Sequence, residues 1–346
     1  MTDQKNDIPR ILIIAPSWVG DMVMSQTLFQ LIKRRAQAQI DVLAPAYIVP
    51  LVKRMPEVHT VIPVDLKHGE WGFFKRYRIG KSLRALKYDQ AIVLPNSFKS
   101  AFIPFFAGIP LRTGWRGEWR YGVLNDVRIL DKQKFPLMIE RFMALGLPKG
   151  SALKKPYSTP ALSVSEDAVQ NVTQRFQIQK KERQPVLAIC PGAEYGPAKQ
   201  WPPKHCAFIA NALLDQGWNV WLFGSKKDQA AADLIMEQTQ GRCGNWVGKT
   251  ALGEAIDLLS LCSVVLTNDS GLMHVAAALN KPLIAIYGSS SPAFTPPLSE
   301  KAQIVSLKLP CSPCFKRTCP FGHYRCLNEI TPEMILRRIA EIKSFE

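Results

Sequence analysis

The sequence lacks any apolar run of about 20 residues, the length that a membrane-spanning helix requires. Its polar start, MTDQKNDIPR, also lacks the pattern of a secretory signal peptide. We therefore expect a cytoplasmic protein, in which disulfides are disfavoured. At 346 residues, 47% of them hydrophobic, the chain is long enough for two α/β domains with buried cores.

Three widespread functional motifs are also missing. No G-x-G-x-x-G follows a predicted strand, which argues against a dinucleotide-dependent dehydrogenase. The Gly-Lys-Thr at 248–250 would complete a P-loop only with glycine in place of Cys243, and no strong strand precedes it. The nucleophile elbow G-x-S-x-G is absent, which argues against an α/β-hydrolase.

Acidic residues are scarce relative to basic ones, 28 against 44, and the formal net charge is +16. Residues 1–180 hold 27 basic and 14 acidic residues, an excess of 13, whereas residues 181–346 hold 17 and 14, an excess of 3. This asymmetry favours an anionic partner for the first half: nucleic acid, a membrane surface or a phosphorylated substrate. A simple effect on solubility is the alternative explanation.

What is present is one pattern that occurs twice. The apolar run Ile11–Ala15 predicts a buried strand that ends at Pro16 and Gly20, and helical spacing begins at Ser25. The second half repeats this order with the strand in PVLAICPGAEYG, a helix and the strand NVWLFGS. The repetition predicts two doubly wound α/β domains, with a cleft between their strand ends that can hold one ligand per domain.

Asp21 falls, on this pattern, in the loop between the first strand and the first helix, where open parallel sheets bind ligands. The plainer explanation is that an acid near a helix amino terminus is favoured by the helix dipole, and the local sequence alone supports it better.

The second half contains a candidate phosphate site. The loop Asn-Asp-Ser-Gly at 268–271 leads from a strand into a helix, whose free N–H groups favour an anion, and His274 follows in the first turn. Alternatively, Asp269 or Ser270 is only a helix cap, and His274 a surface or core histidine. Two further loops after strands would reach the same sheet edge and would suit a nucleotide diphosphate. The candidates are Gly192, Lys199, Gly224, Ser225, Asp269, Ser270, Gly271 and His274.

In the first half, basic residues alternate with aromatic ones, as in WGFFKRYRIGKSLRALK. This alternation of basic and aromatic residues can bind nucleic acid, phosphorylated sugars or an anionic membrane. Some of these residues are explained equally well as a solvated basic face that lies over aromatic residues of the core. The residues in Gly- and Pro-rich loops that favour a binding role are Asn96, Lys99, Arg112, Arg116 and Arg120.

Four of the eight cysteines crowd into CSPCFKRTCPFGHYRC, at Cys311, Cys314, Cys319 and Cys326, with His323 among them. Their spacing is not that of two standard C-x-x-C knuckles, so a metal at this position is left open.

Four stretches closely resemble the ADP-heptose:lipopolysaccharide heptosyltransferases, most nearly the type II members of that family. They are PSWVGDMVMSQ, VLPNSFKSAFIPFFAGIPLRTGWRGEWRYG, CPGAEYGPAKQWP and NDSGLMHVAAALNKPLIAIYGSSSP. The resemblance runs from about residue 10 to about residue 300 and weakens in the cysteine-rich tail.

The resemblance implies a GT-B build, with two Rossmann-like domains facing across a cleft. Residues 1–160 would bind the acceptor, 161–184 would connect, and 185–346 would bind the nucleotide sugar. Inversion at the anomeric carbon and the absence of any metal or other cofactor are also implied.

The implied reaction moves heptose from ADP-heptose to the first heptose of the lipopolysaccharide inner core, on heptosyl-Kdo-lipid A. Asp21 would be the general base, with Gly20 beside it, and Lys199 would neutralise the departing diphosphate. Ser270, Gly271 and the helix that follows would hold the phosphate oxygens.

The acidic, membrane-anchored acceptor would explain the basic first half. It implies a peripheral protein on the inner face of the inner membrane, and no nucleic-acid partner. Two alternatives stay open: the same chemistry on another acceptor, as in a type I or later-core enzyme, and a non-catalytic protein that binds anionic lipid or nucleic acid.

Overall fold

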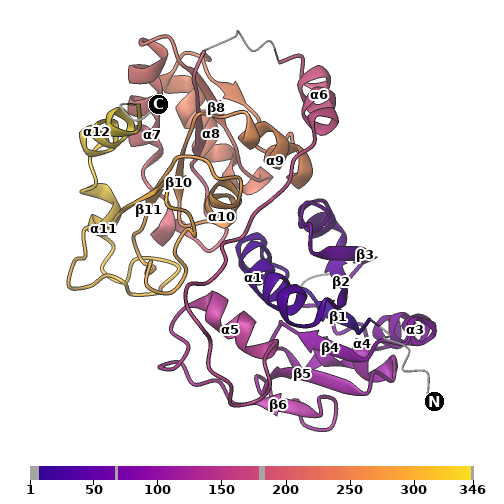
Figure 1. The fold of residues 1–346 in the computed structure, drawn as a ribbon. Coiled ribbons are helices and arrows are strands. Elements are labelled where there is room, and N and C mark those ends of the chain that lie inside the picture. Colours follow the sequence, from indigo (N-terminus) through magenta and orange to yellow (C-terminus); the bar gives the residue numbers. More distant parts are fainter. Residues whose placement is uncertain (1–7, 67–68, 179–183, 344–346) are drawn as a thin grey trace, which may run out of the picture. The chain divides into compact units, whose positions relative to one another are not determined.

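The computed structural model describes residues 8–66, 69–178 and 184–343 (Figure 1). The chain divides into two compact units, Met1–Pro160 and Ala161–Glu346. Each unit is built on one six-stranded parallel sheet, as the repeated sequence pattern predicts.

Unit 1 has the strand order β3-β2-β1-β4-β5-β6. Its strands are β1 (Arg10–Ile14), β2 (Gln39–Pro45), β3 (Val58–Val64), β4 (Gln90–Val93), β5 (Leu111–Trp115) and β6 (Asp126–Arg128). Its α-helices are α1 (Val19–Ala36), α2 (Val49–Val52), α3 (Phe73–Leu83), α4 (Phe102–Phe106) and α5 (Met138–Leu145), and the short 3-10 helix η3 (Phe98–Ala101) precedes α4.

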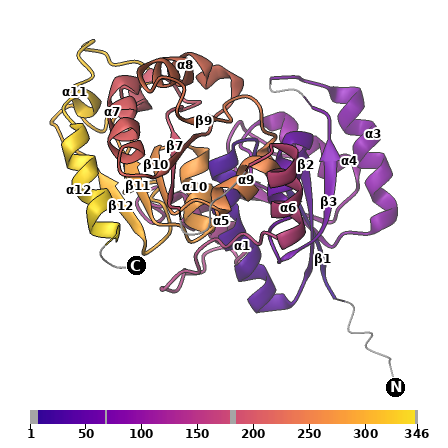
Figure 2. The same cartoon turned by 90° about the horizontal axis from the view of Figure 1, so that it is seen from above.

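Both faces of the unit 1 sheet are covered. Leu12 and Ile14 of β1 pack in one cluster with Leu83 of α3 and Ile103, which lies in α4. Side chains alternate along a strand, so the buried Ile13 points to the opposite face. Helices α1 and α5 pack against each other in this unit, on the other side of the strands from α3 and α4 (Figure 2).

Unit 2 repeats the plan with the order β12-β11-β10-β7-β8-β9. Its strands are β7 (Val186–Cys190), β8 (Asn219–Leu222), β9 (Gly244–Asn245), β10 (Val264–Asn268), β11 (Leu283–Ile286) and β12 (Ala302–Val305). Its α-helices are α6 (Glu166–Arg175), α7 (Pro203–Leu214), α8 (Gln229–Gln238), α9 (Leu252–Ser260), α10 (Gly271–Ala278), α11 (Arg325–Asn328) and α12 (Pro332–Lys343).

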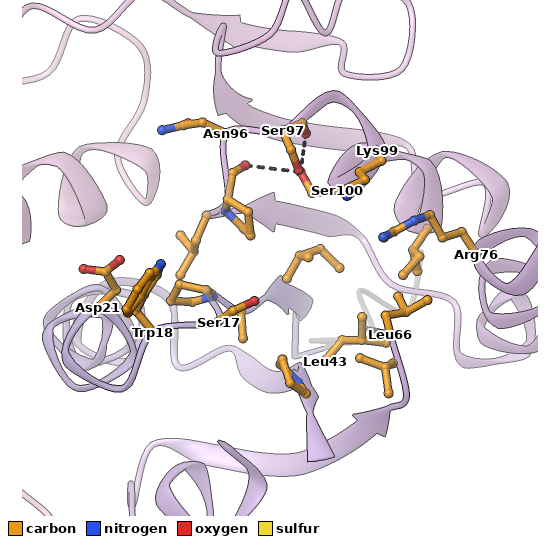
Figure 3. Close-up of a pocket in the computed structure, with 18 of the residues that line it drawn as sticks. Ser17, Trp18, Asp21, Leu43, Leu66, Arg76, Asn96, Ser97, Lys99 and Ser100 are labelled. Atoms are coloured by element: carbon orange, nitrogen blue, oxygen red, sulfur yellow. Dashed lines mark hydrogen bonds between the residues drawn. The ribbon is translucent and has the colours of Figure 1, made fainter. Parts of the chain in front are cut away.

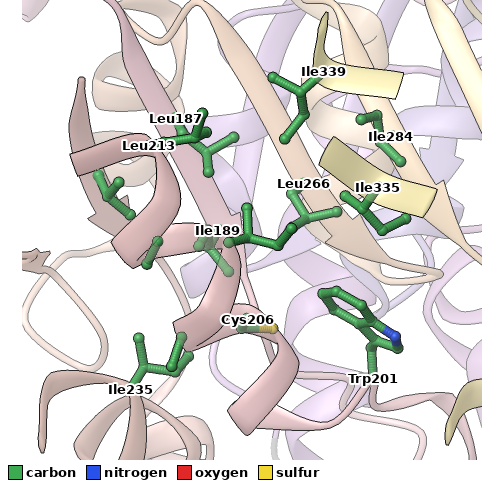
Figure 4. Packing of buried hydrophobic residues seen from close by; sticks show 14 of the residues in the cluster. Leu187, Ile189, Trp201, Cys206, Leu213, Ile235, Leu266, Ile284, Ile335 and Ile339 are labelled. Atoms are coloured by element: carbon green, nitrogen blue, oxygen red, sulfur yellow. The ribbon is translucent and has the colours of Figure 1, made fainter. Parts of the chain in front are cut away.

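The core of unit 2 forms where α7 and α12 pack on the strands. Leu213 of α7 and Ile335 of α12 lie in one cluster with Ile189 of β7 and Leu266, which lies in β10 (Figure 4). The indole of Trp201 closes one end of this cluster and donates from Nε1 to the Ile330 carbonyl at 2.9 Å. Helix α6 lies within the predicted connection and packs against α9; residues 179–183 of that connection lie outside the described residues.

Both sheets reverse their strand order beside their first strand, between β1 and β4 in unit 1 and between β7 and β10 in unit 2. Loops diverge at such a switch point and leave room for a ligand at the carboxyl ends of the strands. Among the described helices, none has the length and apolar character needed to cross a membrane.

Candidate active site

Unit 1 has a cavity of about 480 Å³ at its switch point (Figure 3). Residues 14–18 and Asp21 line it after β1, and residues 94–97 line it after β4. The ends of β2 and β3 contribute Leu43 and Val64, while Arg76 of α3 and Lys99 of η3 complete one side. The volume lies within the range of ordinary small-molecule sites.

Asp21 lies in the first turn of α1, which corrects the prediction that it occupies a loop before a helix starting near Ser25. The helix begins at Val19, after the extended Trp18, whose carbonyl accepts from the Met22 N–H at 2.9 Å. The predicted start of the helix is too late because Ser25 is polar, which hides that it is fully buried within the helix. Its hydroxyl donates to the Met22 carbonyl at 2.7 Å. Gly20 is the second residue of the helix.

Two cations lie across the cavity from Asp21 in the view of Figure 3, Arg76 and Lys99. Arg76 is buried, and its Nε donates to the Trp71 carbonyl at 2.8 Å while Nη2 donates to the Glu70 carbonyl at 3.2 Å. Burial lowers the pKa of Arg76 from its ordinary value. The sequence contains many similar basic residues nearby, and only folding selects Arg76 for the cavity wall.

The other predicted acceptor residues separate into different environments. Asn96 lines the cavity, with its backbone carbonyl accepting from the Glu118 N–H at 3.2 Å. Arg116 is not among the lining residues, and its guanidinium lies 5.3 Å from the centre of the Trp119 ring. Arg112 donates to the Ile109 and Val123 carbonyls.

Arg120 is fully buried, so the predicted contact between this side chain and a substrate does not fit the structure. Its guanidinium donates to the carbonyls of Pro95, at 2.6 Å, and Trp115, and to Ser100 Oγ at 3.3 Å. Burial lowers its pKa to about 10, which leaves the group charged at neutral pH. Arg120 therefore fastens the loop after β4 to the end of β5, behind the cavity wall.

In unit 2 the loops that contain Gly192 and Gly224 meet at the carboxylate of Asp228. A Cβ on Gly192 would lie 2.0 Å from Asp228 Oδ1, and one on Gly224 would lie 2.9 Å from Asp228 Oδ2. Ser225 donates to the same carboxylate from its N–H, at 2.8 Å, and its hydroxyl, at 2.9 Å. At the end of β10, before the third predicted loop continues, Asn268 Nδ2 donates to the Pro191 carbonyl at 2.7 Å. Glycine at 192 and 224 permits this close approach.

Beside these loops lie Lys199, Asp269 and His274. The Lys199 Nζ pairs with Asp269 Oδ2 at 2.5 Å and lies 5.0 Å from the centre of the Tyr195 ring. Burial lowers the pKa of His274 to about 4, the charge of Asp269 opposes that shift, and Lys199 adds to it. His274 is therefore neutral at pH 7, and the ion pair is the charged element of the site.

Ser270 and Gly271 lie where α10 begins. Ser270 is the extended N-cap residue, its side chain makes no capping hydrogen bond, and its Oγ lies 3.3 Å from Thr267 Oγ1. Gly271 is the first residue of the helix, so backbone N–H groups at this end are available to an anion.

The cysteine-rich segment holds free thiols. Cys311, Cys314, Cys319 and Cys326 are all partly exposed and outside any disulfide, and Cys319 Sγ lies 4.0 Å from His323 Nδ1. Across the described ranges, no three or more His, Cys, Asp or Glu side chains are grouped so that they could hold a metal ion.

Known proteins resemble this chain over almost its full length. The model of glycosyltransferase family 9 (heptosyltransferase) matches residues 76–325. Lipopolysaccharide heptosyltransferase 2 of Escherichia coli K12 is 49% identical over 340 residues, which cover 95% of this chain and 97% of that protein. Lipooligosaccharide heptosyltransferase 2 of Haemophilus influenzae is 47% identical over 343 residues, covering 96% and 99%.

A solved structure agrees with these relatives. The E. coli ADP-heptose lipopolysaccharide heptosyltransferase II superposes with a TM-score of 0.86 at 48% identity, over 96% of this chain and 98% of that one. Two parallel six-stranded sheets with flanking helices match the GT-B fold. With a family model that covers most of its length and relatives this similar, the chain belongs to glycosyltransferase family 9, the heptosyltransferases.

Proposed function

We propose that this chain transfers heptose from ADP-heptose to the first heptose of the lipopolysaccharide inner core, with inversion at the anomeric carbon and without a metal. The observation that carries the proposal is the near-half identity to lipopolysaccharide heptosyltransferase 2 over almost the whole of both chains. The cavity that Asp21 lines in unit 1 suits an acceptor sugar in size and polarity.

Asp21 acts as the general base in this proposal. Its carboxylate removes the proton of the acceptor hydroxyl while that oxygen attacks the anomeric carbon, and the bond from that carbon to ADP breaks. Arg76 and Lys99, on the opposite side of the cavity, suit the acidic groups of a phosphorylated acceptor. General base catalysis of this kind is worth about 10²–10⁴ in rate.

Lys199 and the amino terminus of α10 stabilise the diphosphate that leaves. Lys199 is held beside Asp269 at the start of the helix, so the cation is already placed when negative charge develops on ADP. The backbone N–H groups from Gly271 onward supply donors to the same oxygens. Gly192, Gly224 and Ser225 shape the wall of the donor site around Asp228.

Residues 1–160 form the acceptor domain and residues 185–346 the nucleotide-sugar domain in this proposal, with 161–184 between them. The acceptor lipid is anchored in the inner leaflet, so we infer that the enzyme works as a peripheral protein on the inner face of the inner membrane. The basic excess of residues 1–180 supports this inference.

The experiment is ADP release from ADP-heptose with mono-heptosylated Kdo-lipid A, in EDTA, for the wild type, Asp21→Asn and the control Asp131→Asn. Asp131 is an exposed loop residue outside the cavity, so its variant keeps wild-type turnover. Asp21→Asn loses at least 100-fold in kcat while ADP-heptose binding, measured by calorimetry, persists. Equal turnover by Asp21→Asn would remove Asp21 from the mechanism, and loss of wild-type activity in EDTA would remove metal independence.

Lys199 is tested through the donor. Lys199→Ala raises the KM for ADP-heptose and lowers kcat, whereas the KM for the acceptor stays constant; the exposed Lys204→Ala is the control. Unchanged donor kinetics would contradict the role of Lys199. Activity only on Kdo-lipid A without heptose would instead favour transfer to that earlier acceptor.

A further inference from the structure

Helices α3 and α4 of unit 1, with the residues just before α3, carry an aromatic surface that no step of the transfer reaction uses. We call it the α3–α4 face and define it by its exposed side chains Trp71, Phe73, Phe74, Tyr77 and Phe105. Phe74 is 77% exposed and Trp71 is 56% exposed. Single exposed aromatics are common, but a contiguous group of this kind marks an interaction surface.

The rings form one connected group rather than scattered side chains. Phe73 lies edge-on to Phe74 at 5.7 Å and to Phe106 at 5.4 Å, between ring centroids. Tyr77 meets Phe106 at 5.3 Å, and Phe105 meets it at 5.5 Å. Trp71 meets Phe102 at 6.0 Å, and Phe102 stacks on the half-buried Phe106 at 5.6 Å, so all five exposed rings are connected to one group.

The α3–α4 face is also held firmly in place. A Cβ on Gly80 of α3 would lie 2.6 Å from the Cβ of Phe106 and 2.7 Å from the Ile103 carbonyl, so the two helices touch at their backbones. Arg84 Nε donates to the Phe106 carbonyl at 2.9 Å. A surface that is rigid before binding loses little conformational entropy when it binds.

Positive charge surrounds the rings. Helix α3 contains four basic residues and no acidic one, and Lys75, Arg78 and Lys81 are exposed. The Arg112 guanidinium lies 5.6 Å from the centre of the Phe105 ring. Glu70 pairs with Lys75 at 2.9 Å and offsets only one of these charges. Aromatic rings that enter the headgroup region and cations that meet anionic lipids are the combination that binds a helix in the plane of a membrane.

The same helices reach the cavity from their inner side. Arg76 of α3 and Ile103 of α4 line the cavity that holds Asp21, while Phe74 and Phe105 of the same helices face solvent. A partner that binds the outer rings of the α3–α4 face would therefore lie on the outer side of the helices that form this wall of the cavity. Docking of unit 1 in this way would place the cavity wall formed by α3 and α4 next to the lipid that carries the acceptor sugars.

We propose that the α3–α4 face docks unit 1 onto the surface of an anionic lipid bilayer. The inference rests on the proposed function, since it supplies the contact that a lipid-anchored acceptor requires. Two other occupants compete with the bilayer: a protein partner with an acidic groove and a second copy of this chain. The four basic residues of α3 disfavour the second copy, because two such faces would repel each other.

Vesicle sedimentation of the full chain tests the proposal. The probes are phosphatidylcholine vesicles with and without 30% phosphatidylglycerol, in the absence of any substrate. The wild type binds the anionic vesicles at least tenfold more strongly than the neutral ones, and the difference shrinks in high salt. Trp71→Ser with Phe74→Ser lowers the binding at least tenfold. Phe321→Ser, which removes a 67% exposed ring in unit 2, leaves it unchanged.

A second measurement separates docking from catalysis. With a lipid-free heptosyl-Kdo acceptor, Trp71→Ser with Phe74→Ser keeps wild-type kcat, whereas with acceptor embedded in vesicles its kcat/KM falls at least tenfold. Equal vesicle binding by wild type and this variant, or wild-type dimers in light scattering that the variant abolishes, would overturn the proposal. Vesicle binding without any heptose transfer would keep the docking surface and refute the function.

Discussion

His274 provides the sharpest quantitative test of the donor-side geometry. Its side chain is only 5% exposed, and burial lowers its pKa from the ordinary 6.5 to about 4. In the unfolded chain this histidine binds a proton below pH 6.5, whereas in the folded chain it does so only below about pH 4. The unfolded state therefore holds the extra proton between these values, and stability falls as the pH drops through this window.

The magnitude follows from the size of the shift. The pKa values of the unfolded and folded states, 6.5 and about 4, differ by about 2.5, and each pKa unit corresponds to 1.36 kcal/mol. The neutral, buried histidine therefore accounts for about 3 kcal/mol of stability that is present in full above pH 6.5 and lost by about pH 4. His274→Gln has no group that titrates here. Between pH 7.5 and pH 4, the wild type should therefore lose about 3 kcal/mol of unfolding free energy relative to His274→Gln.

Two assays check this expectation. Urea unfolding of both proteins, followed by a probe in unit 2, gives the pH-dependent difference, and any packing effect of glutamine cancels because it is the same at each pH. The imidazole Cε1–H resonance, assigned by its loss in His274→Gln, should stay near the neutral shift down to about pH 5 and titrate with a midpoint near pH 4. A midpoint near pH 6.5, or a free-energy difference that does not depend on pH, would refute the reasoning.

Three further predictions concern packing. Gly192→Ala should lower the unfolding free energy by about 1–2 kcal/mol and weaken ADP binding, because Asp228 must give up its hydrogen bonds to Ser225 to make room for the methyl group. Most of that loss should disappear when Asp228 is also replaced by alanine, whereas additive effects of the two substitutions in a double-mutant cycle would contradict the clash. Arg120→Ala should lower the unfolding free energy by about 3 kcal/mol, because the substitution leaves buried carbonyls without hydrogen-bond donors. Arg116→Ala is the control and should cost about 1 kcal/mol or less in thermal or urea unfolding, so equal costs would show that the burial of Arg120 does not determine its contribution to stability. Gly80→Ala should cost about 1–3 kcal/mol in urea unfolding of unit 1, because its methyl group would meet the Ile103 carbonyl and the Cβ of Phe106 in α4. An unchanged unfolding free energy would mean that the two helices move apart without cost.

Local patterns in the sequence predicted much of the fold. The apolar run at 11–15 predicts β1, which the structure places at Arg10–Ile14, and the run at 186–190 coincides with β7. Such runs are visible in a sequence because a strand that is buried on both faces needs apolar side chains on both. The order of strands and helices then restricts the topology to doubly wound units, and the loops after these strands lie at the sheet edges where ligands bind. The uneven charge between the two halves is likewise a property of the sequence alone.

The tertiary structure decided which side chains those loops present. Ser25 is polar yet buried because its hydroxyl bonds back to the helix, so α1 starts earlier than its apolar spacing predicts and Asp21 lies on the helix. Arg76 and Arg120 come from similar basic, aromatic surroundings in the sequence, but one lines the cavity and the other is sealed behind it. The burial of Arg120 depends on contacts with the distant loop after β4, which no local pattern encodes. Spacing along the chain determines the elements, and their packing determines which charged groups face the site.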